Sequence, residues 1–292
     1  DARVLAGARV TGSIVDEEEW RFEVVDAELK EAPLLPGGEV TVGLSGTVTP
    51  EKVVVGRLTV SDQFSSLEGE ASFAYSLDAG LAAQGTASLR NTTTGESYTV
   101  EGSYGESTVD LTAAFARAPI ARFGELPLSG NVSGSLSATG PTQSPTISAE
   151  VSVVDGRLNE GSVDARASIV LARQELTVSD VAIDLQGSRI ADGSARLDFG
   201  EGRFEADASF SGVLQNKPLT ADFETTGFFA DPLTRSDLAE LVDADLDAVA
   251  AVRSVELGEP ERSDWVFDIR KRGDVIAVSG GIGGAVDGEI RR

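Results

Sequence analysis

The run Arg203-Phe-Glu-Ala-Asp-Ala-Ser-Phe210 alternates polar and apolar residues at every position. Successive side chains of a β-strand point to opposite faces, so this run predicts a strand with one apolar and one polar face. A shift of one residue would exchange the two faces, and the register of such a strand should therefore be strongly specified.

The same period of two recurs along the chain. Further alternating series begin at Val40, Ala71, Val109, Ile147 and Ala165, and a late one begins at Trp265. Gly, Pro, Asn and Asp separate the series, which gives roughly fifteen to eighteen strands at a spacing of about ten to twelve residues. We therefore expect a mainly β fold, an elongated, curled antiparallel sheet that forms an open trough with an apolar inner face.

Several positions interrupt the alternation. Leu176 and Val178 are followed by Val181 and Ile183, an offset of three around Ser179-Asp180 that predicts a β-bulge. A similar break follows Val24. The Asp-Gly pairs at 155–156 and 192–193 are typical of tight hairpin turns, and we expect turns there.

One segment has a different period. Residues 231–252 carry apolar side chains at spacings of three and four, which predicts an amphipathic helix packed against the apolar face of the sheet. A weaker pattern at 113–123, interrupted by Pro119, predicts a short helical turn or an irregular crossover. A proline-rich stretch at 117–146 is a possible joint, but the strand rhythm continues on both sides, so residues 1–292 are expected to form a single repetitive segment of a longer protein.

The composition argues against an enzyme. The chain contains no His, Cys or Met, which excludes the usual catalytic triads, thiol nucleophiles and zinc sites, although a pair of catalytic carboxylates remains conceivable. We expect no metal and no cofactor. Asp243, Asp245 and Asp247 resemble the start of a calcium loop, but Ala248 stands where that loop needs glycine. Asp and Glu outnumber Lys and Arg by 48 to 24, and a net charge of -24 disfavours nucleic acid as a partner.

A resemblance to a known family begins at Leu128-Ser-Gly-Asn-Val-Ser-Gly-Ser-Leu136. Gly140-Pro141, Pro145-Thr-Ile-Ser-Ala149 and Val154-Asp-Gly-Arg-Leu158 continue it. This order of a glycine-bounded strand, a Gly and Pro break, a second strand and an Asp-Gly turn resembles a repeat unit of the TamB family, the large subunit of the translocation and assembly module, which is related to AsmA-like proteins. Ala149 stands where the family often has glycine. The resemblance covers about residues 120–230, and the family's membrane anchor and C-terminal conserved region are not evident.

The resemblance implies a fold, a place and a function. It implies an open β-trough within a periplasmic segment of an inner-membrane-anchored protein that spans the envelope of a diderm bacterium. It also implies a non-enzymatic conduit that carries phospholipid acyl chains between the inner and outer membranes, or that supports outer-membrane protein assembly with a barrel partner.

The candidate groove residues are the apolar members of the central series. They are Ile147, Val151, Val153, Ala165, Ala167, Ile169, Leu171, Leu176, Val178, Val181, Ile183, Phe204, Ala206, Ala208 and Phe210. The alternative is an extracellular or surface β-solenoid of the adhesin type, which would use the same alternation to close its core completely. An outer-membrane barrel is disfavoured because two Trp and three Tyr are too few for aromatic girdles.

Overall fold

The structure is a computed structural model that describes residues 5–14, 20–32, 40–76, 82–123, 128–158, 161–214, 217–229, 245–257, 263–273, 275–281 and 286–291. These residues are almost entirely β-strand, and the expectation of a mainly β chain built from antiparallel sheet is confirmed. The chain divides into two compact units, Asp1–Glu160 and Gly161–Arg292, which are described separately.

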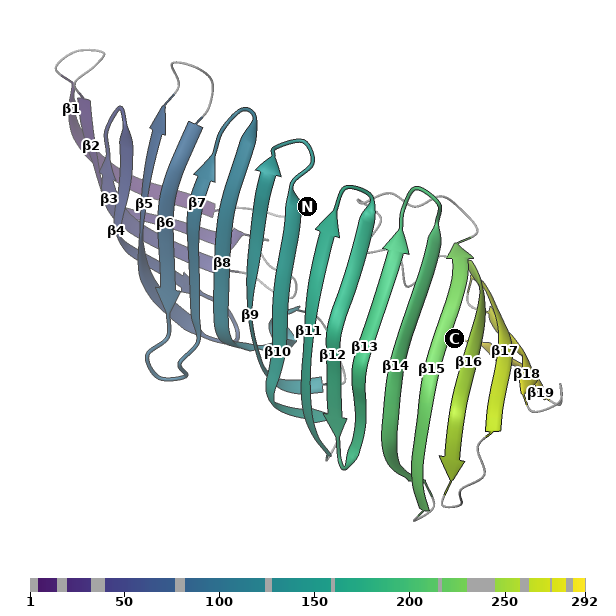
Figure 1. The fold of residues 1–292 in the computed structure, drawn as a ribbon. Helices are drawn as coiled ribbons and strands as arrows, with labels where there is room; N and C mark the ends of the chain where they lie inside the picture. The colour runs from purple at the N-terminus through teal and green to yellow at the C-terminus, as the bar shows by residue number, and fades with distance from the viewer. Residues whose placement is uncertain are drawn as a thin grey trace. The chain divides into compact units, whose positions relative to one another are not determined.

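The first unit is an antiparallel meander in which each strand pairs with the next one along the chain (Figure 1). Its elements are β1 (Leu5–Ile14), β2 (Trp20–Ala32), β3 (Val40–Val48), β4 (Lys52–Ser61), β5 (Ser66–Ser76), β6 (Ala82–Arg90), β7 (Ser97–Tyr104), β8 (Thr108–Pro119), the 3-10 helix η1 (Ile120–Phe123), β9 (Leu128–Pro141) and β10 (Thr146–Leu158).

The second unit repeats this arrangement, again with antiparallel pairing between consecutive strands. Its strands are β11 (Gly161–Ala172), β12 (Glu175–Leu185), β13 (Ser188–Asp198), β14 (Arg203–Leu214), β15 (Lys217–Phe229), β16 (Leu246–Leu257), β17 (Ser263–Arg272), β18 (Val275–Gly281) and β19 (Val286–Arg291).

The sheet is open and does not close into a barrel. In the described ranges the four-residue η1 is the sole helix, so no further helix covers either face of the strands there. Nor do these ranges contain a helix with the length and apolar character needed to cross a membrane. Apart from the strand ends that η1 reaches, the apolar side of the described strands is therefore not covered by a second described layer.

The helix predicted at 231–252 is wrong where the structure describes it. Residues 246–252 belong to strand β16, and residues 231–244 lie outside the described residues. The spacing of Leu246 and Val249 suggested a helix, but Leu246, Ala248, Ala250 and Val252 also alternate. Pairing of this stretch with both β15 and β17 supplies ladder hydrogen bonds on two sides, which outweigh a weak helical preference.

The weaker helical pattern at 113–123 divides at Pro119. Strand β8 continues through Pro119, and only Ile120–Phe123 forms a helical turn. The possible joint at 117–146 lies inside the first unit, because the boundary between the units falls after Glu160.

The irregular positions of the strands are β-bulges. The bulge predicted at Ser179-Asp180 is confirmed, since the register shifts between Val178 and Val181 and Asp180 has a φ of 54°. The turns predicted at the two Asp-Gly pairs are wrong. Asp155 and Asp192 lie within β10 and β13 at register shifts, with φ of 55° and 53°. A left-handed Asp followed by Gly suits a bulge as well as a turn, because Asp tolerates positive φ better than most residues.

The bulge at Asp192 gives a first testable prediction. Asp192→Val should lower the free energy of unfolding by about 1–2 kcal/mol, because a β-branched residue is strained in the left-handed region, whereas Asp192→Gly should not destabilise. Urea denaturation followed by circular dichroism measures both. Asp164→Val is the matched control, an exposed position of β11 without positive φ. Equal losses for the two valine variants would contradict this account of the bulge.

Candidate functional site

The strand register of the second unit joins the predicted apolar series into one face. Directly paired residues of antiparallel strands project their side chains to the same side of the sheet. From β11 to β14, one row consists of Leu171, Leu176, Leu197 and Phe204, and the next consists of Ile169, Val178, Ala195 and Ala206. We call this side of the strands the apolar face.

The other candidates in the second unit lie on the same face. Ala165 pairs with Ile183, which pairs with Ile190 and through it with Phe210. Ala208 pairs with Phe223, Val181 pairs with Gly193, and Ala167 lies opposite the bulge of β12. Glu205 and Asp207 alternate with these residues and are exposed on the opposite, polar face, so the predicted orientation of β14 is confirmed.

The first unit has an equivalent apolar face. Ile147 pairs with Ala138 and through it with Leu111. Val151 pairs with Gly134, the partner of Phe115, and Val153 pairs with Val132, the partner of Ala118. The structure thus places the candidates of β10 on one continuous surface with strands β8 and β9.

Most side chains on the apolar face are only half-buried. In β17, Trp265, Phe267 and Ile269 are half-buried, whereas Val266, Asp268 and Arg270 between them are exposed. A core enclosed between two layers would bury such residues almost completely. The partial burial therefore arises within the sheet, from neighbours on adjacent strands.

Some large side chains of the apolar face are more than one-third exposed. In the first unit they form the exposed apolar patch, which consists of Phe73 (41%), Val100 (45%), Tyr104 (41%), Leu111 (36%) and Leu136 (41%). Rows of paired residues connect them across β5 to β9. Contiguous exposed apolar surface is a common feature of interaction sites and ligand-binding grooves.

The exposed apolar patch is not among the groove residues predicted from the sequence. The signal was present, because Phe73 and Leu111 belong to alternating series of the same kind as those of the candidates. What the alternation does not contain is the degree of exposure, which depends on whether another element covers the strand.

Glycines opposite aromatic residues shape this surface. A Cβ atom at Gly85 would lie 2.5 Å from Cδ1 of Phe73 on the neighbouring strand, and one at Gly134 would lie 2.8 Å from Cζ of Phe115. Each ring therefore lies over the backbone of its neighbour. The two rings therefore lie close to the backbone of the sheet, and the layer of side chains on the apolar face is thin at these positions.

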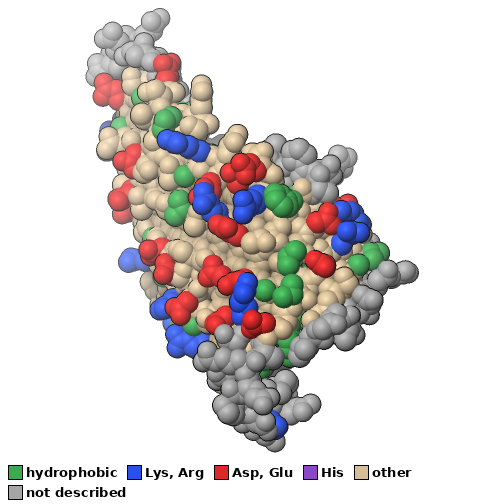
Figure 2. All heavy atoms as spheres, turned by 45° about the vertical axis from the view of Figure 1, so that its right-hand side comes forward, with side chains coloured by type: hydrophobic (Ala, Val, Ile, Leu, Met, Phe, Trp, Pro, Cys, Tyr) green, Lys and Arg blue, Asp and Glu red, His purple; other side chains and the backbone are tan. Residues whose placement is uncertain are grey.

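The polar face carries exposed ion pairs between neighbouring strands. Arg196 contacts Glu175 at 2.5 Å, Arg253 contacts Glu224 at 2.8 Å, and Asp247 receives hydrogen bonds from Arg270 and Arg272. The bonds from Arg272 and Arg270 lower the pKa of Asp247 below its ordinary value. Figure 2 shows one face of the molecule on which acidic and basic side chains intermingle around isolated apolar ones. Exposed pairs of this kind contribute little stability, and they keep this face in water.

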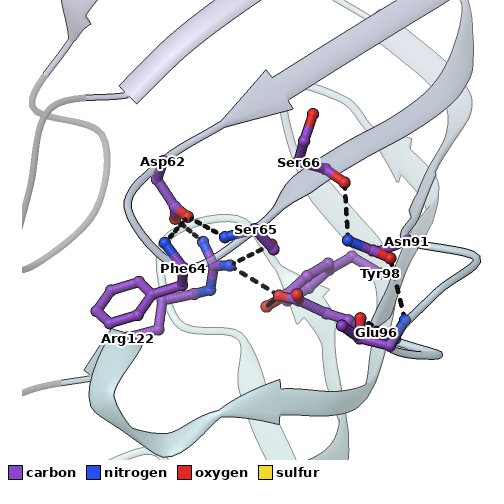
Figure 3. Close-up of polar contacts among 9 residues, drawn as sticks. Asp62, Phe64, Ser65, Ser66, Asn91, Glu96, Tyr98 and Arg122 are labelled. Atoms are coloured by element: carbon purple, nitrogen blue, oxygen red, sulfur yellow. Dashed lines mark hydrogen bonds and ion pairs between the residues drawn. The ribbon is translucent and has the colours of Figure 1, made fainter.

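A buried ionic cluster lies at one strand end of the first unit (Figure 3). Arg122 of η1 bonds to Asp62 through Nη1, and its Nη2 donates to Glu96 Oε1 at 2.8 Å and to Ser65 Oγ at 2.9 Å. The Arg122, Glu96 and Asp62 side chains are 3%, 1% and 6% exposed. Two carboxylates and one guanidinium are thus removed from water together.

Local hydrogen bonds hold the two acids of the cluster. Asp62 Oδ1 accepts the backbone N–H groups of Phe64 and Ser65, which fixes the turn between β4 and β5. Tyr98 donates its hydroxyl to Glu96 Oε1 at 2.7 Å, and burial together with this bond raises the pKa of Tyr98 well above its ordinary value. Tyr98 therefore remains a neutral donor at physiological pH.

The described part of the chain offers no group of three or more potential metal ligands. Comparison with protein-family models, with curated proteins and with solved structures finds no match to this chain. The resemblance to the TamB family therefore remains an expectation from the sequence.

The buried ionic cluster gives a second prediction. Arg122→Met should lower the free energy of unfolding by about 3–5 kcal/mol, because it leaves two buried carboxylates without their counterion. Adding Asp62→Asn and Glu96→Gln should recover most of the loss. Arg196→Met, which breaks an exposed pair, is the control and should hardly move the midpoint of urea denaturation. Similar losses for Arg122→Met and Arg196→Met would show that burial does not matter here.

Proposed function

We propose that this chain is a non-enzymatic carrier surface for the acyl chains of phospholipids. The observation that supports this most directly is the half-buried apolar face, which runs through consecutive strands and includes the exposed apolar patch. An acyl chain laid on such a face gains about 0.8 kcal/mol for each methylene removed from water. Many weak contacts of this kind need no individual recognition residue, in keeping with a chain without His or Cys.

The setting of this activity rests on the sequence resemblance. If the chain is a TamB-like segment, the acyl chains belong to phospholipids that move between the inner and outer membranes across the periplasm. The apolar face would then be one stretch of a longer path, and an outer-membrane barrel assembly partner would lie at its end.

The alternative, an adhesin-like solenoid with a closed core, is less well supported. A closed core would bury Phe73, Leu111 and Leu136, which remain 36–41% exposed.

Two pairs of matched variants test the proposal. Leu111 (36% exposed) and Val54 (38% exposed) lie on opposite faces of the first unit with nearly equal exposure. Ile169 and Val170 are neighbours on opposite faces of β11. Leu111→Asp and Ile169→Asp should abolish capture of a photoactivatable phospholipid, whereas Val54→Asp and Val170→Asp should not. Because a charge at a half-exposed position can still reach water, thermal unfolding of all four variants should stay near that of the wild type.

Mass spectrometry of lipids extracted from natively purified protein complements this comparison. Wild type that captures no phospholipid, or equal loss of capture from both faces, would sink the acyl-chain proposal.

A further inference from the structure

Burial on the apolar face of the first unit is unequal along the strands. Val40 (2%), Leu67 (3%), Ala118 (0%) and Ile120 (4%) lie near the strand end where β4 connects to β5, β6 to β7 and β8 to β9. We call this the closed end. The exposed apolar patch lies in the middle of the strands and toward the opposite, open end, where the small residue Ala71 (6%) and Val109 (8%) are the strongly buried apolar residues among those described.

The 3-10 helix η1 covers the apolar face at the closed end. Ala118, Ile120 and Val132 form a buried cluster against which Tyr98, Phe115, Leu128, Val151 and Val153 pack. Two candidate groove residues, Val151 and Val153, are half-buried and pack against this cluster. The apolar face is therefore accessible at the open end and blocked at the closed end.

The buried ionic cluster holds this block in place. Neighbouring strands lie about 4.8 Å apart, so on a flat sheet the β4–β5 and β8–β9 connections would be roughly 19 Å from one another. Arg122 nevertheless bonds to Asp62 and Ser65 of the first connection and to Glu96 of the β6–β7 connection between them. The sheet must therefore curl tightly at this end, and one guanidinium joins three successive connections.

Two aromatic rings also contact the guanidinium group of Arg122. Its Cζ lies 5.6 Å from the ring centroid of Phe64 and 6.0 Å from that of Tyr98. Tyr98 also packs against the apolar cluster below η1. Tyr98 contacts both Arg122 and the apolar cluster, and Arg122 and Ile120 belong to the same short helix. We therefore expect a substitution of Arg122 to weaken the packing of Ile120 as well.

We propose that Asp62, Glu96 and Arg122 form an ionic clasp that keeps the acyl-chain surface of the first unit shut at its closed end. Hydrocarbon chains then enter from the open end, and their methyl termini point toward Ile120. This inference rests on the proposed function and adds the end from which the chains enter and a residue, Arg122, that keeps the opposite end closed.

Residue-level mapping on the wild-type protein tests the entry side. The probe is a fatty acid with a diazirine next to its terminal methyl group, and labelled peptides are identified by mass spectrometry. Labels should fall on the exposed apolar patch and on residues up to Phe115. Residues 118–122 and 151–158 should carry only a low background of label.

Variants of the clasp test the control. Arg122→Lys keeps the charge but lacks the fork that reaches both acids, and Asp62→Asn removes one partner with little change of shape. In either variant, labelling of residues 118–122 should rise about tenfold, the worth of one charged hydrogen bond. Arg117→Lys is the matched control, since Arg117 forms an exposed pair with Asp155 and should leave the label pattern unchanged. Circular dichroism shows which variants are folded. If Arg122→Lys does not fold, the labelling of Asp62→Asn alone tests the clasp.

The outcomes separate the clasp from the proposed function. No label anywhere on the apolar face would refute the acyl-chain proposal itself. Labels at both strand ends of the wild type would leave that proposal intact and refute the clasp. Labels confined to the open half in wild type and in folded clasp variants alike would also refute the clasp, because something other than Arg122 would close that end.

Discussion

The cross-strand register is the constraint on which this structure depends. In each strand, alternate residues point to opposite faces of the sheet. The backbone hydrogen bonds alone do not determine which of the two sets of residues lies on which face. The choice is made where Phe204 pairs with Leu197 and Leu176 with Leu171, because a slip at any strand would place valine and phenylalanine among aspartates. The bulges at Asp155, Asp180 and Asp192 absorb the local irregularities, so that the face is the same before and after each of them.

Under the proposed function, an apolar face that stays partly exposed to water is a compromise between stability and ligand binding. A second layer over Phe73 and Leu136 would bury more area and would also remove the surface that we propose binds acyl chains. The first unit concentrates its burial at one end instead. There Arg122, Asp62 and Glu96 bear the desolvation of three charges, and Glu96 Oε2 and Arg122 Nε find no hydrogen-bond partner among the described residues. A cluster so incompletely satisfied is poor as a source of stability, and what it achieves is to fix the positions of three connections.

Much of the fold follows from the sequence, because alternation is a local property. The apolar members of β14 and the bulge at Asp180 were evident from spacing alone. Asp192-Gly193 was assigned to a turn, since the same pair of residues suits a turn and a bulge, and only the flanking strands distinguish them. The pattern that continues to Val252 was assigned to a helix because short apolar runs can satisfy both periods, and pairing with β15 and β17 decided for strand. The bond between Arg122 and Asp62 spans 60 residues and depends on the curl of the sheet, which no local pattern contains.

The meander has a consequence for how such a chain can change in length. Within each unit, every described strand pairs with its neighbours in sequence, so the stability of a unit is close to a sum over adjacent pairs. Removing one strand would reverse the direction of all that follow and break the antiparallel ladder, whereas removing a hairpin of two strands restores both direction and face. A hairpin of two strands is therefore the smallest unit that can be inserted or deleted without disturbing the antiparallel order. Such a surface can grow or shrink by two strands at a time while every remaining residue keeps its face, and only the two strands that flank the change meet a new partner.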